Sequence, residues 1–399
     1  MKSLLSITPL EDALQLFFET LNPAPTQETI LTVDALGRTT VTAIRALADS
    51  PAYDSCAMDG IAVMSQHTQE ATTDTPMVLT LGEDCARVNT GNVLPTPYDA
   101  VIMIEEVTFN AAGQAVITRP ATAGQHVRGQ GEDIQVGDPI LAEGHTITAL
   151  DLGALLSAGI AQLAVYRQPV VGIVSTGSEL VDVSQFDPNI AGQVVESNSH
   201  MLAGLIQSKG LTAVRYPKLA DDLDRIKDRL SEAAQHCDVI LISAGTSAGT
   251  HDYTAQAIRD LGQVLVHGLA IKPGKPAILG RIGQTAVIGL PGYPVSTYVV
   301  YTAVVGPWLE RLYPVGVGDK LNVQATLSRT LVSSFKQQEY VRVGLSRDET
   351  GQWVATPLPK QVGTTMSLAN SHGFVIIPQL TEGIAAGDRV DVVLHRPLD

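Results

Sequence analysis

Small side chains and glycines follow an apolar run in the middle of the chain, within Asp238–Asp252. The run Val239–Ile242 has no polar alternation, which is typical of a strand buried on both faces of a parallel sheet. The loop after it offers backbone amides and hydroxyl donors, and its two glycines let the backbone approach a ligand closely. A helical pattern begins near Ala255, so the loop precedes a helix N-terminus, where an anion is favoured. The loop is a candidate phosphate cradle, and an ordinary tight turn is the alternative.

Two lysines and a second Pro-Gly loop lie further along the chain. Lys272 and Lys275 stand in a Lys-Pro-Gly-Lys-Pro stretch, which places two ammonium groups on one rigid loop. Pro291 and Pro294 belong to Leu-Pro-Gly-Tyr-Pro-Val-Ser, which follows a second apolar run and ends at Ser296. Ligands of open parallel sheets bind at the carboxyl ends of strands, so we expect these loops to converge there. Turn punctuation and solvated lysines are the alternative interpretation.

The composition narrows the class of protein. A chain of 399 residues with 45% hydrophobic and 17% charged residues is typical of a globular protein with two to four domains. The net charge of −15 opposes general binding to nucleic acid or to anionic membranes, since both need a cationic surface. We find no signal peptide and no apolar stretch of membrane length, and expect a cytoplasmic protein. The distant Cys56, Cys85 and Cys237 indicate reduced thiols rather than a zinc site.

The elements that must position these residues form three regions. Short strands and turns at 77–141 predict a small all-β domain, and alternation from 321 onward predicts a second one. Between them, the order strand, loop, helix repeats through Leu312, as in a doubly wound sheet. Near the N-terminus, Thr8 is the predicted cap of a helix that begins at Pro9.

The three loops together resemble the molybdopterin molybdenumtransferase family, of the MoeA and gephyrin E-domain type. The lysine motif is intact, and Asp252 stands near the first loop as the family's Asp does. Two positions depart from the family's pattern. Ala244 stands where the first loop glycine is usual, and Tyr293 replaces the usual Asn.

Further motifs resemble the same family and lie in its order along nearly the whole chain. They are Asp59-Gly60 after Cys56-Ala57-Met58, Thr90-Gly91, Glu132-Asp133, and Thr176-Gly177-Ser178-Glu179. The resemblance implies these catalytic candidates: Asp59, Thr90, Asp133, Glu179 and Asp252. It implies these ligand-binding candidates: Thr176, Gly177, Asp221, Ser243, Gly245, Thr246, Ser247, Gly249, Lys272, Lys275, Pro291, Pro294 and Ser296. One of Asp221 and Asp222 is also expected to cap the following helix.

The resemblance also implies a multidomain α/β plus β fold. Its parts are a two-piece linker domain, an inserted β domain, a doubly wound α/β molybdopterin-binding domain and a C-terminal β-barrel. The expected boundaries are 1–45 with 143–168, 46–142, 169–317 and 318–399. A homodimer is implied, with the active site between the α/β domain of one chain and the β domains of the other.

The implied reaction inserts molybdenum from molybdate into adenylylated molybdopterin and releases AMP, with Mg²⁺. Lys272 and Lys275 would neutralise phosphates, while Glu179 and Asp252 supply the oxygen ligands that Mg²⁺ prefers. Asp59 and Asp133 would line the molybdate side. The implied partners include the adenylyltransferase of the pathway.

Two alternatives keep the fold but change the function. A paralogue would bind molybdopterin without insertion or would insert tungstate, and a scaffold protein would bind the pterin without catalysis. AMP release that depends on both Mg²⁺ and molybdate separates the enzyme from a binding protein.

Overall fold

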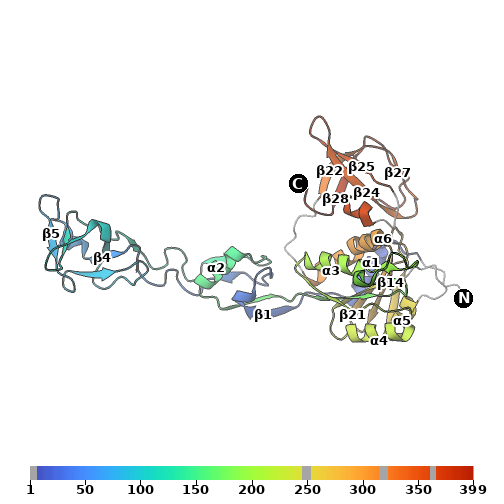
Figure 1. Cartoon of the computed structure of the whole chain (residues 1–399), viewed down its shortest axis with the longest axis horizontal. Helices are drawn as coiled ribbons and strands as arrows, with labels where there is room; N and C mark the ends of the chain where they lie inside the picture. Colours follow the sequence, from blue (N-terminus) through green and yellow to red (C-terminus); the bar gives the residue numbers. More distant parts are fainter. Residues whose placement is uncertain (1–6, 245–252, 314–321, 360–364, 399) are drawn as a thin grey trace. The chain divides into compact units, whose positions relative to one another are not determined.

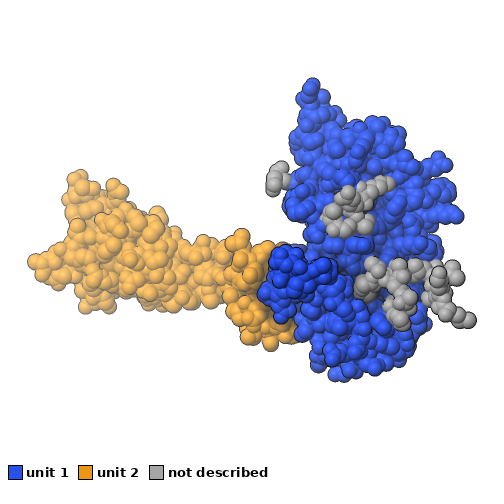
Figure 2. Space-filling view, turned by 45° about the vertical axis from the view of Figure 1, so that its right-hand side comes forward, with its two compact units in different colours: residues 1–26, 166–399 blue, residues 27–165 orange. Residues whose placement is uncertain are grey.

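The computed structural model describes residues 7–244, 253–313, 322–359 and 365–398. The chain forms two compact units, coloured separately in Figure 2. Unit 1 comprises residues 1–26 and 166–399, and unit 2 comprises residues 27–165. Within the described ranges, no helix combines the length and apolar character needed to cross a membrane.

A six-stranded sheet forms the centre of unit 1, with the order β16-β13-β17-β21-β20-β18. Strands β16, β13, β17 and β21 are parallel, and β20 runs antiparallel to both of its neighbours. The bounds are β13 Val170–Ser175, β16 Thr212–Arg215, β17 Val239–Ala244, β18 Gln263–His267, β20 Ile278–Ile282 and β21 Thr285–Pro291. The expected apolar strands are confirmed, because uninterrupted burial leaves no alternation in their sequences.

Helices cover both faces of this sheet (Figure 1). One core contains Ile173, Leu241 and Ile288 from the sheet, and α1, α3, α6 and α7 pack on it. The opposite core contains Val174, Ile240 and Val287, covered by α4 and α5. The bounds are α1 Leu10–Leu21, α3 Asn198–Gln207, α4 Leu223–Ala233, α5 Tyr253–Leu261, α6 Pro294–Val300 and α7 Gly306–Leu312, with a π-helical turn at Tyr301–Val305 between the last two. Alternate residues of each strand therefore enter different cores, which makes the sheet doubly wound.

Helix α1 begins one residue later than the sequence predicts. Pro9 is the N-cap, and no side chain caps the helix. Thr8 instead pairs with the chain after β18: its N–H donates to the Gly268 carbonyl at 3.0 Å, and its carbonyl accepts from Ala270 N–H at 2.8 Å. This tertiary pairing takes Thr8 out of the capping position.

A closed five-stranded barrel completes unit 1. Its strands pair in the cyclic order β24-β25-β22-β28-β26, and β26 pairs again with β24. The bounds are β22 Asn322–Leu327, β24 Gln338–Arg347, β25 Trp353–Pro357, β26 Gly373–Ile377 and β28 Arg389–Leu394, with β23 Leu331–Val332 and β27 Gly383–Ile384 as a separate pair. Helix α8, Thr365–Ala369, contacts α6. Strand β19 (Ile271–Lys272), from the long connection between β18 and β20, joins this barrel sheet through β24.

Unit 2 consists of short strands and one helix. Three-stranded sheets β6-β4-β7 and β5-β9-β8 lie within 60–117, and two-stranded ladders join β3 to β10, β2 to β11 and β1 to β12. The bounds are β1 Gln27–Leu31, β2 Ile44–Arg45, β3 Ser55–Cys56, β4 Gly60–Val63, β5 Met77–Leu79, β6 Cys85–Val88, β7 Ala100–Met103, β8 Thr108–Phe109, β9 Ala115–Ile117, β10 Val127–Arg128, β11 Pro139–Leu141, β12 Gln162–Tyr166 and α2 Ala149–Ser157.

Candidate functional site

Three strands of the α/β sheet end in register, and the loops of the candidate site follow them. Ser243 on β17 pairs with Ser175 on β13 and with Leu290 on β21. We call this side of the sheet the carboxyl edge. Strand β18 runs parallel to β21, because each is antiparallel to β20, so the connection that carries the lysines also leaves from this edge.

The loop after β13 packs on the ends of two neighbouring strands. Thr176 is buried, and both its N–H and its hydroxyl donate to the Ser243 carbonyl, at 2.9 and 3.2 Å. Gly177 N–H donates to the Leu219 carbonyl at 3.0 Å, which attaches the loop to the chain after β16. The three segments are thus fixed to one another by backbone hydrogen bonds.

Gly177 lies beneath the carboxylate of Glu179. Its φ of +153° lies where only glycine fits well, and a Cβ there would come within 3.0 Å of both carboxylate oxygens. The missing side chain therefore leaves room for the Glu179 carboxylate to fold back over the loop. Glu179 itself is exposed at the carboxyl edge, so its oxygens are accessible to a cation.

Asp221 and Asp222 have different roles, and the sequence did not show which of them caps the following helix. Asp222 caps α4, because its Oδ1 accepts from the N–H groups of Asp224 and Arg225 at 3.0 and 3.1 Å. Asp221 turns toward the loop after β13, where its Oδ2 accepts from Ser178 N–H at 3.2 Å. Asp221 therefore lies beside Glu179 in the same group of loops.

The two lysines of the Lys-Pro-Gly-Lys-Pro loop have different surroundings. Lys272 Nζ lies 3.2 Å from Glu339 Oε1 and 3.5 Å from Ser334 Oγ, both in the barrel part of unit 1. Lys275 is exposed, and in the part of the chain that the structure describes it makes no ion pair. One ammonium is therefore held in place, while the other is free to reach a ligand.

The loop after β21 is fixed mainly through its backbone. Thr297 Oγ1 donates to the Pro291 carbonyl at 2.5 Å, and Asn198 Nδ2 donates to the Gly292 carbonyl at 2.7 Å. Pro294 begins α6, where its missing N–H has no consequence. Ser296 is buried in the same helix, and the exposed side chain of Tyr293 faces solvent.

Part of the predicted site falls in a segment without a described structure. Gly245, Thr246, Ser247, Gly249 and Asp252 lie outside the described residues. Strand β17 ends at Ala244, opposite Pro291 of β21, and α5 begins at Tyr253. Strand β17 therefore ends at the carboxyl edge.

Asp59 and Thr90 lie together in unit 2. Asp59 Oδ1 accepts from Thr90 N–H at 2.6 Å and from Thr90 Oγ1 at 2.9 Å. These donors, the backbone N–H first and the hydroxyl second, lower the pKa of Asp59. Asp59 is exposed at the start of β4, so the structure presents an ionised carboxylate with a fixed orientation.

Asp133 lies on another loop of unit 2. Its N–H donates to the Ser50 carbonyl at 3.0 Å, which fixes the backbone, and its side chain is exposed. The neighbouring Glu132 has a local partner, since its Oε2 accepts from Gly129 N–H at 3.2 Å. Both side chains are exposed, and Glu132 is the one with this backbone donor.

Glu339 was absent from the sequence prediction. The only sequence signal is its position two residues before Val341 and four before Val343, which places a carboxylate on the inward-facing side of an alternating strand. A charged residue at such a position is unusual enough to mark a partner or a ligand.

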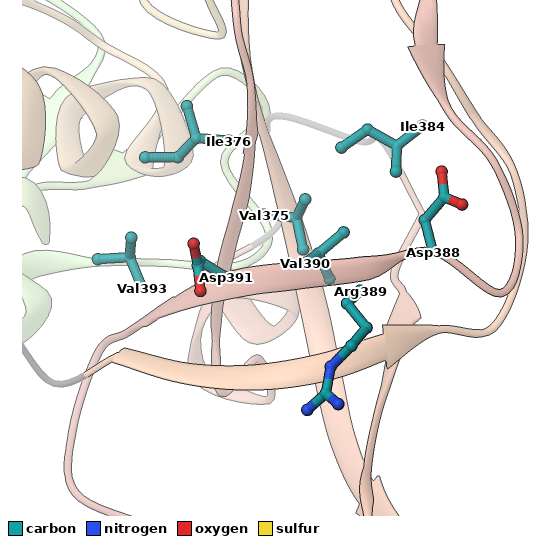
Figure 3. Close-up of a pocket in the computed structure, with 8 residues that line it drawn as sticks. All are labelled: Val375, Ile376, Ile384, Asp388, Arg389, Val390, Asp391 and Val393. Carbon is teal, nitrogen blue, oxygen red and sulfur yellow. The ribbon is translucent and has the colours of Figure 1, made fainter.

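A separate hollow of about 590 Å³ lies on the barrel surface, over β26 and β28 (Figure 3). Its lining combines apolar residues, among them Val375, Ile384 and Val390, with the charged Asp388, Arg389 and Asp391. None of the predicted site residues that the structure describes lines it. We therefore place the candidate site at the carboxyl edge and not in this hollow.

A doubly wound sheet with hydrogen-bond donors, lysines and a carboxylate at its carboxyl edge defines a class of proteins that bind anionic ligands there. Comparison with known proteins identifies the family. Three family models match the chain: the MoeA N-terminal region (domain I and II) at 8–159, a probable molybdopterin binding domain at 172–311, and the MoeA C-terminal region (domain IV) at 324–395.

Individual relatives match along nearly the whole chain. A putative molybdopterin biosynthesis protein of Methanocaldococcus jannaschii is 30% identical over 411 residues, which cover 99% of this chain and 100% of the relative. The molybdopterin molybdenumtransferase of Haemophilus influenzae is 29% identical over 383 residues, with 93% and 94% covered. The crystal structure of a molybdopterin biosynthesis MoeA protein from Pyrococcus horikoshii superimposes with a TM-score of 0.74 at 31% identity, covering 98% of this chain and 100% of that one. The chain belongs to the MoeA family.

Proposed function

We propose that this protein is a molybdopterin molybdenumtransferase, which inserts molybdenum from molybdate into adenylylated molybdopterin and releases AMP. The observation that carries the proposal is the convergence of the Thr176 loop, the lysine loop and the Pro291 loop at one carboxyl edge. Relatives named molybdopterin molybdenumtransferase support the same reaction. The substrate carries a pyrophosphate, and this edge offers both backbone donors and ammonium groups.

The phosphate groups would be bound by the loops of unit 1. Lys272 and Lys275 would neutralise phosphate charge, and the segment from Gly245 to Gly249 would donate backbone N–H groups. The remaining ligand-binding residues would shape the pocket for the pterin and the nucleotide: Thr176, Gly177, Asp221, Ser243, Pro291, Pro294 and Ser296. Loop attachment through the backbone leaves these residues ordered before the ligand arrives, which lowers the entropic cost of binding.

Magnesium fits the carboxylates at the carboxyl edge. The exposed Glu179 carboxylate lies next to Gly177, and Mg²⁺ is usually held by one or two carboxylates together with water and substrate phosphates. We propose Glu179 and Asp252 as the protein ligands. When bound, the metal would polarise the pyrophosphate for cleavage.

Molybdate would be handled by unit 2. Asp59, held by Thr90, and the exposed Asp133 would orient the oxyanion through water or protons, because carboxylates repel an anion directly. We propose a homodimer in which the α/β domain of one chain and the β domains of the other form each active site. We also propose the four-domain division with the boundaries given above, with α1 packed on the α/β domain.

The proposed function also implies a partner protein and a cellular compartment. A pathway adenylyltransferase that makes the adenylylated pterin would be the partner that supplies the substrate. Cys56, Cys85 and Cys237 are free buried thiols, which suits the reducing cytoplasm.

The test is AMP release from adenylylated molybdopterin in the presence of Mg²⁺ and molybdate. We expect release to require both ions, and Asp59→Asn to block product formation while nucleotide binding stays intact. A pterin-binding paralogue or scaffold would bind the substrate without releasing AMP, and an enzyme specific for tungstate would respond to tungstate alone. Sedimentation of the active protein tests the dimer, since a monomer that still turns over would exclude a shared site.

A further inference from the structure

Glu339 carries a carboxylate into the interior of the barrel. Its side chain is only 3% exposed, and it shares the inward face of β24 with Val341, Val343 and Leu345 of the barrel core. A carboxylate loses several kcal/mol of hydration when it is buried, so it requires donors and a positive partner.

The donors to Glu339 come from two places in unit 1. Ser334 donates to Oε1 through both its N–H, at 2.7 Å, and its hydroxyl, at 2.5 Å. Lys272 is a positive partner, since its Nζ lies 3.2 Å from the same oxygen. The lysine belongs to the loop at the carboxyl edge of the α/β sheet, so this ion pair joins that loop to the barrel.

Backbone pairing fixes the two residues opposite each other. Strand β19 runs parallel to β24, with Lys272 in register with Glu339 and Ile271 with Gln338. Gln338 N–H donates to the Ala270 carbonyl at 2.8 Å, which continues the pairing. The ammonium is therefore positioned at both ends of its side chain, by strand pairing at Cα and by the carboxylate at Nζ.

The Lys272 side chain remains 48% exposed, although its ammonium contacts Glu339 and Ser334. An ammonium has three N–H donors, so it can contact a ligand without leaving its protein partners. A small cavity of about 50 Å³, lined by Lys272, Pro273, Glu339 and Arg342, adjoins the pair.

We propose that Glu339 is a positioning residue that holds the Lys272 ammonium at the point where the substrate's phosphate charge must be neutralised. This inference rests on the proposed function. The fixed ammonium needs no reorganisation as the phosphate bond breaks, which favours the reaction step. The carboxylate also offsets part of the lysine's positive charge, so it weakens ground-state binding of the phosphate. Glu339 thus contributes to turnover at the expense of affinity.

The test compares Glu339→Gln in the parent protein and in a Lys272→Met background. Two quantities are measured: affinity for inorganic pyrophosphate by calorimetry, and the rate of AMP release. In the parent background, we expect pyrophosphate binding to tighten about two- to tenfold, because a nearby negative charge is lost. We expect AMP release to slow about tenfold or more, because the ammonium loses its fixed position. In the Lys272→Met background, both changes should disappear.

A matched control is Asp391→Asn, which removes an exposed carboxylate from β28 of the same barrel (Figure 3). It should leave both measurements unchanged. Thermal unfolding provides a further readout: Lys272→Met alone should lower the melting temperature, because it removes a cationic partner of the buried carboxylate, and adding Glu339→Gln should restore it.

Three results would overturn the positioning role. They are weaker pyrophosphate binding in Glu339→Gln, an equal effect of that substitution in both backgrounds, or no effect in either measurement. Failure of the proposed function is a separate result. A parent protein that releases no AMP would refute the transferase, while pyrophosphate affinity and melting temperature would still show whether Glu339 acts through Lys272.

Discussion

Replacing Gly177 by alanine should disturb the proposed metal site while the protein stays folded. The glycine has a φ of +153°, and a non-glycine residue in such a sparsely populated region costs about 1–3 kcal/mol. The added Cβ would lie 2.9 Å from Leu180 Cγ and 3.0 Å from both oxygens of Glu179, so these side chains must move. We expect the folded protein to survive this cost, with the Glu179 carboxylate displaced from its place above the loop.

Gly283→Ala is the matched control. Gly283 has a φ of +59° in the turn between β20 and β21, and a Cβ there would meet nothing within 4 Å. The substitution costs about 1–2 kcal/mol of backbone strain and leaves Glu179 untouched. Both variants should lose stability in urea titrations, and Gly177→Ala should lose more, because its Cβ also displaces Leu180 and Glu179.

Only Gly177→Ala should change the response to magnesium. We expect the Mg²⁺ concentration for half-maximal AMP release to rise about tenfold, since a misplaced ligand weakens a site that uses few protein oxygens. The assay is a Mg²⁺ titration of AMP release for the parent and for both variants. If Gly177→Ala and Gly283→Ala show the same Mg²⁺ requirement as the parent, the assignment of Glu179 as a metal ligand is wrong.

Three further predictions concern other parts of the chain. Thr90→Val should raise the pKa of Asp59 without restoring its ordinary value, because the backbone N–H still donates; a carboxyl NMR titration that shows no change would contradict this. Burial, with a smaller effect of nearby cations, lowers the pKa of His395 to about 4 from 6.5. As the pH falls from about 6.5 to about 4, His395 therefore binds a proton in the unfolded chain before it does so in the folded protein, and the unfolding free energy should drop by up to about 3 kcal/mol. Urea titrations of His395→Gln should show a flatter pH dependence of this free energy. Phe17→Ala should cost about 3–5 kcal/mol in urea unfolding, because Phe17 is fully buried, whereas Leu16→Ala, at a site that is 43% exposed, should cost little.

Prediction of the fold from the sequence was most accurate for segments in which one physical requirement, burial on both faces, determines the residue pattern. The strands Val170–Ser175, Val239–Ala244 and Thr285–Pro291 are buried on both faces, so their apolar runs are unbroken and recognisable. Their shared direction follows from the alternation of strands and helices, and with it the convergence of the loops.

The sequence predicted less where two residues compete for one role or where a partner lies far away. Either Asp221 or Asp222 could cap α4, and only the structure shows that Asp222 does so. Thr8 has a good capping sequence but pairs with Gly268 and Ala270, far along the chain. Glu339 was missed for the same reason, since its partner Lys272 is adjacent only after β19 joins the barrel.

The packing of α1 affects the order in which the protein can fold during synthesis. Phe17 packs on Trp308 with tilted rings and Phe18 stacks on it, at ring-centroid distances of 4.4 and 5.6 Å, although α1 is among the first segments to be made. At about 5–20 residues per second, translation needs on the order of tens of seconds to reach Trp308. The other neighbours of α1 in the sheet, β18 and β20, are also made late, whereas unit 2 is complete once Val165 has been made. Nascent chains that stop between Val165 and Gln263 should therefore contain a folded unit 2 and an α1 helix whose apolar face is unprotected and prone to aggregation.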